Sequence, residues 1–147
     1  MSHSYAQNLV HLVFSTKDRA KTLAPAVRPK LQAYIVGICK NRGILVYAVG
    51  GTEDHIHCLL QIPPTDSVAR TVLTIKANSS RWLRQASRYF AWQQGYAAFS
   101  VSASLIPAVS RYIQNQEAHH HGMTFEEEFL ALLQKHGVKY DPTFVLG

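Results

Sequence analysis

Residues 44–62 of this 147-residue chain read ILVYAVGGTEDHIHCLLQI, two apolar runs separated by a short polar turn. Short apolar runs bounded by Gly or Pro are typical of buried β-strands, and a turn of a few residues between two such runs indicates consecutive strands. The turn here is Gly-Gly-Thr-Glu-Asp, and Pro63 and Pro64 end the second run. The segment therefore predicts one strand over residues 44–51 and the next over residues 54–62.

The rest of the chain is predicted to form further strands and helices. Apolar residues that recur every three or four positions indicate the helices, and short apolar runs indicate the strands. Pro, Gly and polar cap residues mark where the helices begin and end. In chain order these elements are a strand over 8–16, a helix from Pro29 to Gly43, a helix from Asp66 or Ser67 to about Arg88, a strand over 96–102, a helix over about 107–120, and a helix from Thr124 to Gly137. At the start of the last helix, Thr124 and Glu127 form a capping-box pattern.

The predicted order of elements is β-α-β-β-α-β, followed by two further helices. The first six elements match the split βαβ arrangement of ferredoxin-like folds, in which two helices cover one face of an antiparallel sheet. We therefore predict an α+β, ferredoxin-like fold, and we expect the opposite face of the sheet to stay open for a ligand or a partner chain. Residues 1–147 contain no linker, repeat or low-complexity segment, so a single domain is expected.

The composition limits the classes of protein to which this chain can belong. The formal net charge of +6 fits a polyanionic partner. The hydrophobic residues, 47% of the chain, are enough to form a core. No run approaches the ~18 apolar residues of a membrane span, and no signal-like segment precedes the first strand. Cys39 and Cys58 lie far apart in apolar contexts, so we predict two buried, reduced thiols in a soluble, cytoplasmic protein.

Two histidines lie in the predicted strand over residues 54–62. Side chains alternate along a strand, so His55 and His57 share one face with Leu59 and Gln61. The other face is wholly apolar and is expected to pack on the helices; it consists of Ile56, Cys58, Leu60 and Ile62. Two imidazoles at this spacing can bind one divalent metal ion. A His-x-His pair taken alone is more often two surface histidines, however, and a metal site needs a third ligand.

The third ligand is sought in two places. Glu53 and Asp54 are near in sequence, but Asp54 would point to the core side if the strand already begins there. Gln116 is the better candidate, because an amide oxygen is a hard neutral ligand that suits Mg²⁺ or Mn²⁺ beside imidazoles. Tyr112 lies four residues before Gln116 in a predicted helix and therefore shares its face.

Tyr112 has two interpretations. An isolated tyrosine on this helix face most simply belongs to the core. Beside a metal-bound phosphodiester, however, a phenol forms a transesterification site. Its oxygen attacks phosphorus, the 3′-hydroxyl leaves, and a 5′-phosphotyrosine remains. In this interpretation the metal that orients the scissile phosphate is Mg²⁺ or Mn²⁺, and its ligands are His55, His57 and Gln116.

These motifs resemble those of single-tyrosine HUH transposases, the kind encoded by small insertion sequences of the IS-two-hundred type. His55-Ile56-His57 is similar to their His-hydrophobic-His motif. Tyr112 with Gln116, in RYIQNQ, is similar to their nucleophile motif. Other stretches also resemble the family, and together the resemblance spans about residues 5–140; they are HLVFSTK, IKANSSRW and WQQGYAAFSVS.

The resemblance implies a DNA transposase that cleaves and rejoins single-stranded DNA, recognised through hairpins near the ends of its element. It implies a homodimer in which Tyr112 of one subunit can serve His55 and His57 of the other. It also implies no nucleotide cofactor, because the phosphotyrosine bond conserves the energy of the broken phosphodiester. Two alternatives stay open: a related HUH nuclease for replication initiation or repeat processing, and a non-catalytic nucleic-acid-binding module on the same fold.

Basic residues in two places are predicted to contact DNA phosphates, which would make binding fall with salt. A solvated cationic face is the alternative for each of them. They are Lys17 and Arg19 after the first strand, and Lys76, Arg81 and Arg84 along the long helix. Residues 119–121 are three consecutive histidines. Because consecutive helical side chains point about 100° apart, we expect helix-end cations or DNA contacts there and no shared metal ion.

Overall fold

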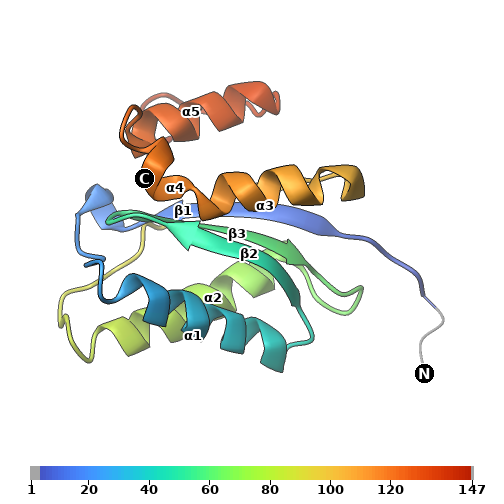
Figure 1. Cartoon of the computed structure of the whole chain (residues 1–147), viewed down its shortest axis with the longest axis horizontal. Helices are drawn as coiled ribbons and strands as arrows, with labels where there is room; N and C mark the ends of the chain where they lie inside the picture. Colours follow the sequence, from blue (N-terminus) through green and yellow to red (C-terminus); the bar gives the residue numbers. More distant parts are fainter. Residues whose placement is uncertain (1–3, 147) are drawn as a thin grey trace.

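A four-stranded sheet forms the centre of the protein, and helices cover both of its faces (Figure 1). The computed structural model describes residues 4–146. Its strands are β1 (Leu9–Ser15), β2 (Leu45–Gly51), β3 (His55–Gln61) and β4 (Ala97–Ser100), in the order β2-β3-β1-β4. Each neighbouring pair is antiparallel. The order of elements and the order of strands together confirm the predicted α+β, ferredoxin-like arrangement.

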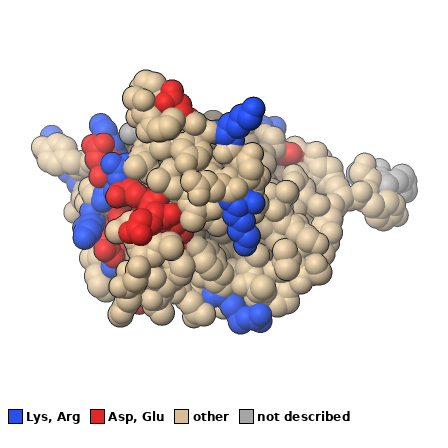
Figure 2. All heavy atoms as spheres, turned by 90° about the horizontal axis from the view of Figure 1, so that it is seen from above, with Lys and Arg blue, Asp and Glu red and all other residues tan. Residues whose placement is uncertain are grey.

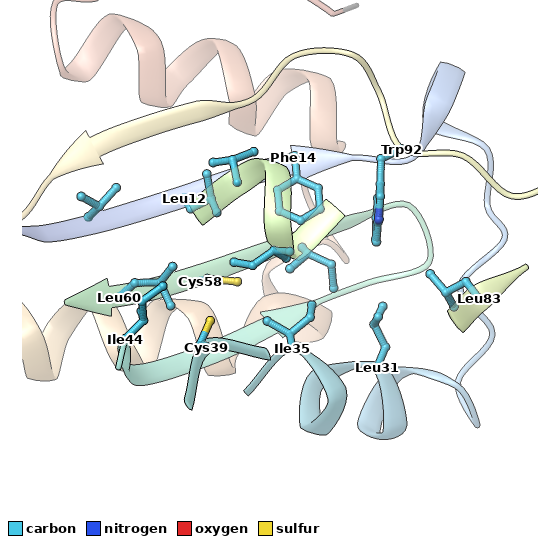
Figure 3. Packing of buried hydrophobic residues seen from close by; sticks show 14 of the residues in the cluster. Leu12, Phe14, Leu31, Ile35, Cys39, Ile44, Cys58, Leu60, Leu83 and Trp92 are labelled. Carbon is cyan, nitrogen blue, oxygen red and sulfur yellow. The ribbon is translucent and has the colours of Figure 1, made fainter. Parts of the chain in front are cut away.

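One face of the sheet packs against α1 (Arg28–Asn41) and α2 (Val68–Leu83). Alternate side chains of the strands point into this layer, and apolar residues at helical spacing on the two helices meet them. Cys39 and Cys58 belong to this core, where both are buried and free, as predicted. Figure 3 shows the packing, which also includes Leu12, Phe14, Leu31, Ile35, Ile44, Leu60, Leu83 and Trp92.

The opposite face of the sheet is covered by α3 (Ile106–Gln114), α4 (Gln116–His119) and α5 (Phe125–Lys135), so the expectation of an open face was wrong. The reason is that this face carries apolar residues beside its histidines, and leaving them in water would forfeit about 25 cal/mol per Å². Ala48 and Leu59 of the sheet pack with Ile113 of α3. A further cluster joins the sheet to α5; it consists of Val13, Ala97, Phe99, Phe125, Phe129 and Leu133.

Two predicted helix boundaries differ from the structure. The long helix ends at Leu83 and not near Arg88, because residues 84–88 are exposed and offer no apolar side chain larger than that of Ala86 to bury. The helix predicted over residues 107–120 is interrupted at Asn115, whose φ of −98° and ψ of 23° separate α3 from α4.

The start of α5 agrees with the prediction. Thr124 accepts a hydrogen bond from the backbone N–H of Glu127, and the Glu127 carboxylate accepts one from the backbone of Thr124, which is the predicted capping box. The short 3₁₀ helices η1 (Lys17–Arg19) and η2 (Ala103–Leu105) complete the described elements. Within residues 4–146, none of the helices is long and apolar enough to cross a membrane.

Gly50 of β2 allows α3 to approach the sheet closely. It lies opposite His57 in the pairing of β2 with β3. The backbone of Ile113 passes directly over it, so that a Cβ atom added at Gly50 would lie 2.0 Å from the Ile113 carbonyl oxygen. Any other residue would therefore push α3, which carries Tyr112, away from the sheet.

Gly50→Ala should lower the free energy of unfolding by about 1–3 kcal/mol, because overpacking at a backbone contact forces the helix to move. Gly37→Ala is the matched control, since it lies inside α1 and nothing stands within 4 Å of an added Cβ. The control should be neutral or stabilising by up to ~1 kcal/mol. Urea denaturation followed by circular dichroism measures both, and equal midpoints would contradict the role of the close contact.

Candidate active site

The two histidines of β3 point away from the core formed with α1 and α2, as the alternation along the strand predicts. His55 and His57 are 0% exposed, because the C-terminal helices cover this face of the sheet. Leu59, two residues further along the same face, packs with Ile113 of α3. The imidazoles therefore lie in a closed, polar cluster beneath α3, α4 and α5.

The ring of His55 is held from two sides. Its Nδ1 lies 2.7 Å from Asp54 Oδ1 and 3.1 Å from Thr52 Oγ1, and its Nε2 lies 2.9 Å from Gln116 Oε1. Asp54 was expected to point to the core if the strand began there. β3 begins at His55 instead, so Asp54 belongs to the preceding turn and its side chain contacts the His55 ring. Burial by itself raises the pKa of Asp54, but the hydrogen bond with His55 outweighs burial and lowers it. The Asp54 carboxylate thus fixes the orientation of the His55 ring.

The ring of His57 is held by two other side chains. Its Nδ1 lies 2.8 Å from His11 Nε2 of β1, and its Nε2 lies 3.0 Å from Glu128 Oε1. Burial lowers the pKa of His57 to about 4, although Glu128 opposes this shift. Burial, aided by His57, lowers the pKa of His11 to about 3. Both rings are neutral at pH 7, which is the form that binds metal ions.

Glu128 of α5 contacts most of the other side chains of the cluster, and it was not predicted as a site residue from the sequence. It is 1% exposed. Its carboxylate accepts a hydrogen bond from the Tyr112 hydroxyl and lies 3.0 Å from Nε2 of both His57 and His120. Burial by itself raises the pKa of Glu128, but the hydrogen bonds with His120 and His57 outweigh burial and hold it well below its usual range. One signal was available, namely that Glu128 lies on the same helical face as the apolar residues of α5.

Tyr112 of α3 lies beside the histidine pair in the same chain. Its ring centroid is 5.8 Å from that of His57, and its hydroxyl donates to Glu128. Burial and the Glu128 carboxylate raise the pKa of the phenol above its ordinary value. The hydroxyl is therefore protonated at neutral pH.

Gln116 is 1% exposed at the start of α4, and its neighbours determine its orientation. Its Nε2 donates to Glu128 Oε2 at 3.1 Å. Its Oε1 faces two ring nitrogens, Nε2 of His55 at 2.9 Å and Nε2 of His120 at 3.0 Å. His119 Nε2 also lies 3.5 Å from Glu128 Oε2. Because α4 ends at His119, two of the three consecutive histidines reach one carboxylate, contrary to the expectation for a continuous helix.

The donor atoms of this cluster are compatible with a divalent metal ion. One nitrogen each of His55 and His57 and one oxygen of Glu128 lie within 4.8 Å of one another. Imidazole nitrogens together with carboxylate or amide oxygens are a common donor set for divalent ions. Asp54 and His11 hold the two rings from behind, as is usual for metal-binding histidines.

Most of the chain is similar to a known protein family. Residues 4–116, which include both histidines of β3, match the family described as "Transposase IS200 like". The chain belongs to this family. Tyr112 and Gln116 lie at the end of the part that matches the IS200-like transposases, whereas His120 and Glu128 lie beyond it.

Individual relatives of this IS200-like transposase are distant in sequence. They include the transposases for insertion sequence element IS200 from Salmonella typhimurium strain LT2 and from Salmonella typhi. Each is 26% identical over 125 residues, which cover 79% of this chain and 81% of the relative.

Two solved structures share its fold. One is a candidate transposase from Deinococcus radiodurans R1, with a TM-score of 0.64, 23% identity, and coverage of 79% of this chain and 95% of that one. The other is a REP-associated tyrosine transposase bound to a REP hairpin, with a TM-score of 0.62, 15% identity, and coverage of 82% and 73%.

The basic residues predicted after the first strand lie at the edge of the molecule near α5. Lys17 is exposed. Arg19 forms an ion pair with Glu126 at 2.9 Å and donates to the backbone oxygen of Leu146 at 2.8 Å. Figure 2 looks onto the side of the molecule formed by α3, α4 and α5, where Lys and Arg lie in separate places with acidic residues between some of them. This side therefore carries no continuous basic surface among the described residues.

The basic residues of α2 lie on the other side of the sheet from the cluster, because α2 packs against the opposite face (Figure 1). Arg81 and Arg84 are exposed. Lys76 donates to the backbone oxygens of Gln93 and Gly95, and burial lowers its pKa to about 8. The structure therefore does not bring these three residues to the histidine pair.

The lowered pKa values of His57 and His11 predict that acid destabilises the metal-free protein. In the unfolded chain a histidine binds its proton near pH 6.5, whereas in the folded chain His57 does so only near 4 and His11 only near 3. Their contribution to stability is complete above pH 6.5 and is lost as the pH falls toward 4. The loss should be about 1.4 kcal/mol per histidine for each pH unit.

Urea denaturation in EDTA between about pH 7 and pH 5 measures this dependence. His11→Asn removes one buried ring and should reduce the slope of stability against pH. His121→Asn, at an exposed position, should keep the wild-type slope. A His11 variant with an unchanged slope would show that this ring does not contribute.

Proposed function

We propose that this protein cleaves and rejoins single-stranded DNA through a 5′-phosphotyrosine on Tyr112, and so moves an insertion sequence. The observation that carries the proposal is the carboxylate shared by the nucleophile and the metal-binding pair: Glu128 accepts from the Tyr112 hydroxyl and contacts His57 Nε2. A core tyrosine needs no buried imidazoles beside it, and this chain belongs to a family of transposases.

The proposed cleavage is a transesterification. The Tyr112 oxygen attacks phosphorus, the bond from phosphorus to the 3′-oxygen breaks, and the 3′-hydroxyl leaves. The phenol starts protonated, and Glu128 Oε2, which accepts its hydrogen bond, would take that proton and pass it to the departing 3′-oxygen. Rejoining reverses the steps, because a 3′-hydroxyl attacks the phosphotyrosine and the proton returns to Tyr112.

His55, His57 and Gln116 would hold Mg²⁺ or Mn²⁺ in this proposal. The ion would neutralise charge on the scissile phosphate and polarise it for attack. Asp54 and His11 would keep the two rings in position for this task, since each contacts the ring nitrogen that faces away from the metal-binding side.

Two hollows at the surface, both lined in part by residues of the segment from His119 to Glu128, would offer a path for the DNA strand. The first is lined by Arg19 and Lys21 and reaches His120. The second has mostly apolar walls from α3 and α5 and reaches Tyr112 and Glu128. A strand that crosses both would place phosphates near the cations of the first hollow and a base against the walls of the second.

The proposed DNA contacts follow from this path. Arg19, which lines the first hollow, and Lys17, at the other end of η1, would bind phosphates of the same strand. Lys76 and Arg81 on α2, and Arg84 just after its end, would meet only DNA that extends around the molecule.

Single-stranded DNA with end hairpins is the proposed substrate. The REP-associated tyrosine transposase that shares this fold was solved with a REP hairpin, which supports a hairpin as the recognised element. The same structure favours a second candidate function, the processing of repeated sequences by the same chemistry.

Tyr112→Phe tests the nucleophile. The wild-type protein, mixed with Mn²⁺ and 3′-labelled single-stranded DNA from the region flanking its gene, should form a covalent adduct that survives a denaturing gel. Tyr112→Phe should form none. Tyr47→Phe, whose hydroxyl contacts Gln61 away from the cluster, should form as much as the wild type. If the wild type binds DNA from the flanking sequences but forms no covalent adduct with any of it, the proposal is wrong and the protein is a non-catalytic DNA-binding module.

We also propose that the protein is a homodimer. Light scattering at micromolar concentration should give a mass of about twice 16.5 kDa. A monomeric mass under these conditions would contradict this part of the proposal while leaving the chemistry of Tyr112 open to the adduct test.

A further inference from the structure

We propose that His120 and Glu128 are metal ligands together with His55, His57 and Gln116, and that this donor set prefers Mn²⁺ to Mg²⁺. The inference rests on the proposed metal-dependent function and deepens it. The two added ligands lie beyond residues 4–116, the part of the chain that matches the transposase family.

The first argument is the spacing of the donor atoms. Nε2 of His57 and of His120 each lie 3.0 Å from Glu128 Oε1. Nε2 of His55 and of His120 lie 2.9 Å and 3.0 Å from Gln116 Oε1, and His55 Nε2 lies 3.5 Å from Glu128 Oε1. Neighbouring ligands of an octahedral ion with bonds of about 2.1 Å are about 3.0 Å apart. These contacting pairs are thus spaced as neighbouring ligands of one ion are. Glu128 belongs both to the group with His55 and His57 and to the group with His119 and His120, and within each group the donor atoms lie within 4.8 Å of one another.

The second argument is that hydrogen bonds alone do not satisfy these groups. His55 Nδ1 faces the Asp54 carboxylate, and the tautomer with its proton on Nδ1 directs a lone pair at Gln116 Oε1. The Gln116 oxygen cannot donate, and its amide nitrogen is already directed at Glu128 Oε2. Two acceptors 2.9 Å apart repel each other, and a cation between them removes the conflict.

The third argument is charge. Glu128 is a carboxylate that is 1% exposed, and a buried anion is costly unless it is paired. A divalent cation bound at Oε1 would add to the pairing that the histidines provide, while Oε2 would keep its contacts with Tyr112 and Gln116. Glu128 would therefore connect the ion directly to the nucleophile.

The preference for Mn²⁺ follows from the number of imidazoles. Mg²⁺ binds mainly to oxygen ligands and keeps several of its waters. Three ring nitrogens, from His55, His57 and His120, suit Mn²⁺ and the later transition metals better.

Isothermal titration calorimetry of the full chain with Mn²⁺, and separately with Mg²⁺, tests both parts of the inference. The wild type should bind Mn²⁺ at least about tenfold more tightly than Mg²⁺. Glu128→Gln and His120→Asn should each weaken Mn²⁺ binding by about tenfold or more. The matched controls Glu126→Gln and His121→Asn, from the same segments, should bind Mn²⁺ as the wild type does.

Circular dichroism in EDTA establishes that each variant is folded before its titration. Electron spin echo spectroscopy of the wild-type Mn²⁺ complex provides a test without any substitution, because it counts coordinated imidazoles and should find three. Two imidazoles, or equal affinity for Mg²⁺ and Mn²⁺, would overturn the inference.

His57→Ala separates this inference from the proposed function. If His57→Ala loses Mn²⁺ binding while Glu128→Gln and His120→Asn keep the wild-type affinity, the proposed metal site stands and the added ligands are wrong. If the wild type binds neither ion, the metal-dependent function and the added ligands fail together.

Discussion

The buried carboxylate of Glu128 is the interaction on which the C-terminal half of the structure depends. One side chain on α5 receives contacts from His57 of β3, Tyr112 of α3, Gln116 of α4 and His120 just after it. A buried carboxylate without partners destabilises a fold by several kcal/mol. α5 can therefore pack in few other positions, because in most of them Glu128 would lose its partners. The sheet and the three C-terminal helices are therefore held in one arrangement by polar contacts, whereas apolar packing alone would allow them to slide.

Much of the fold was predictable because its determinants are local. The alternation of His55 and His57 with Ile56 and Cys58 separates a polar face from a core face without any knowledge of the partner strands. Tyr112 and Gln116 were predicted to share one helix face. The helix is interrupted at Asn115, but both side chains still contact Glu128.

The rest depends on contacts between distant segments. Glu128 follows Glu126 and Glu127 in the first turn of α5, where acidic residues favour any helix, so its type did not set it apart. Only its direction differs, and that is decided by which face of α5 meets the sheet. His120 reaches the cluster because the helix is broken at Asn115 and α4 stops at His119, and no Gly or Pro stands between Pro107 and Gly122 to mark these positions. The covered face was missed for the same reason, because the sequence does not say onto which surface a C-terminal helix folds back.

Gly50 lies between the two parts of the candidate site, the histidines of β3 and the tyrosine of α3. It pairs with His57 across the β2–β3 ladder, and the backbone of Ile113, next to Tyr112, rests on it. The absence of a side chain at this one position therefore sets how close the Tyr112 hydroxyl lies to the imidazoles. A displacement of about 1 Å at a reacting group can cost about a hundredfold in rate, so the activity proposed for Tyr112 would depend on the missing side chain of Gly50.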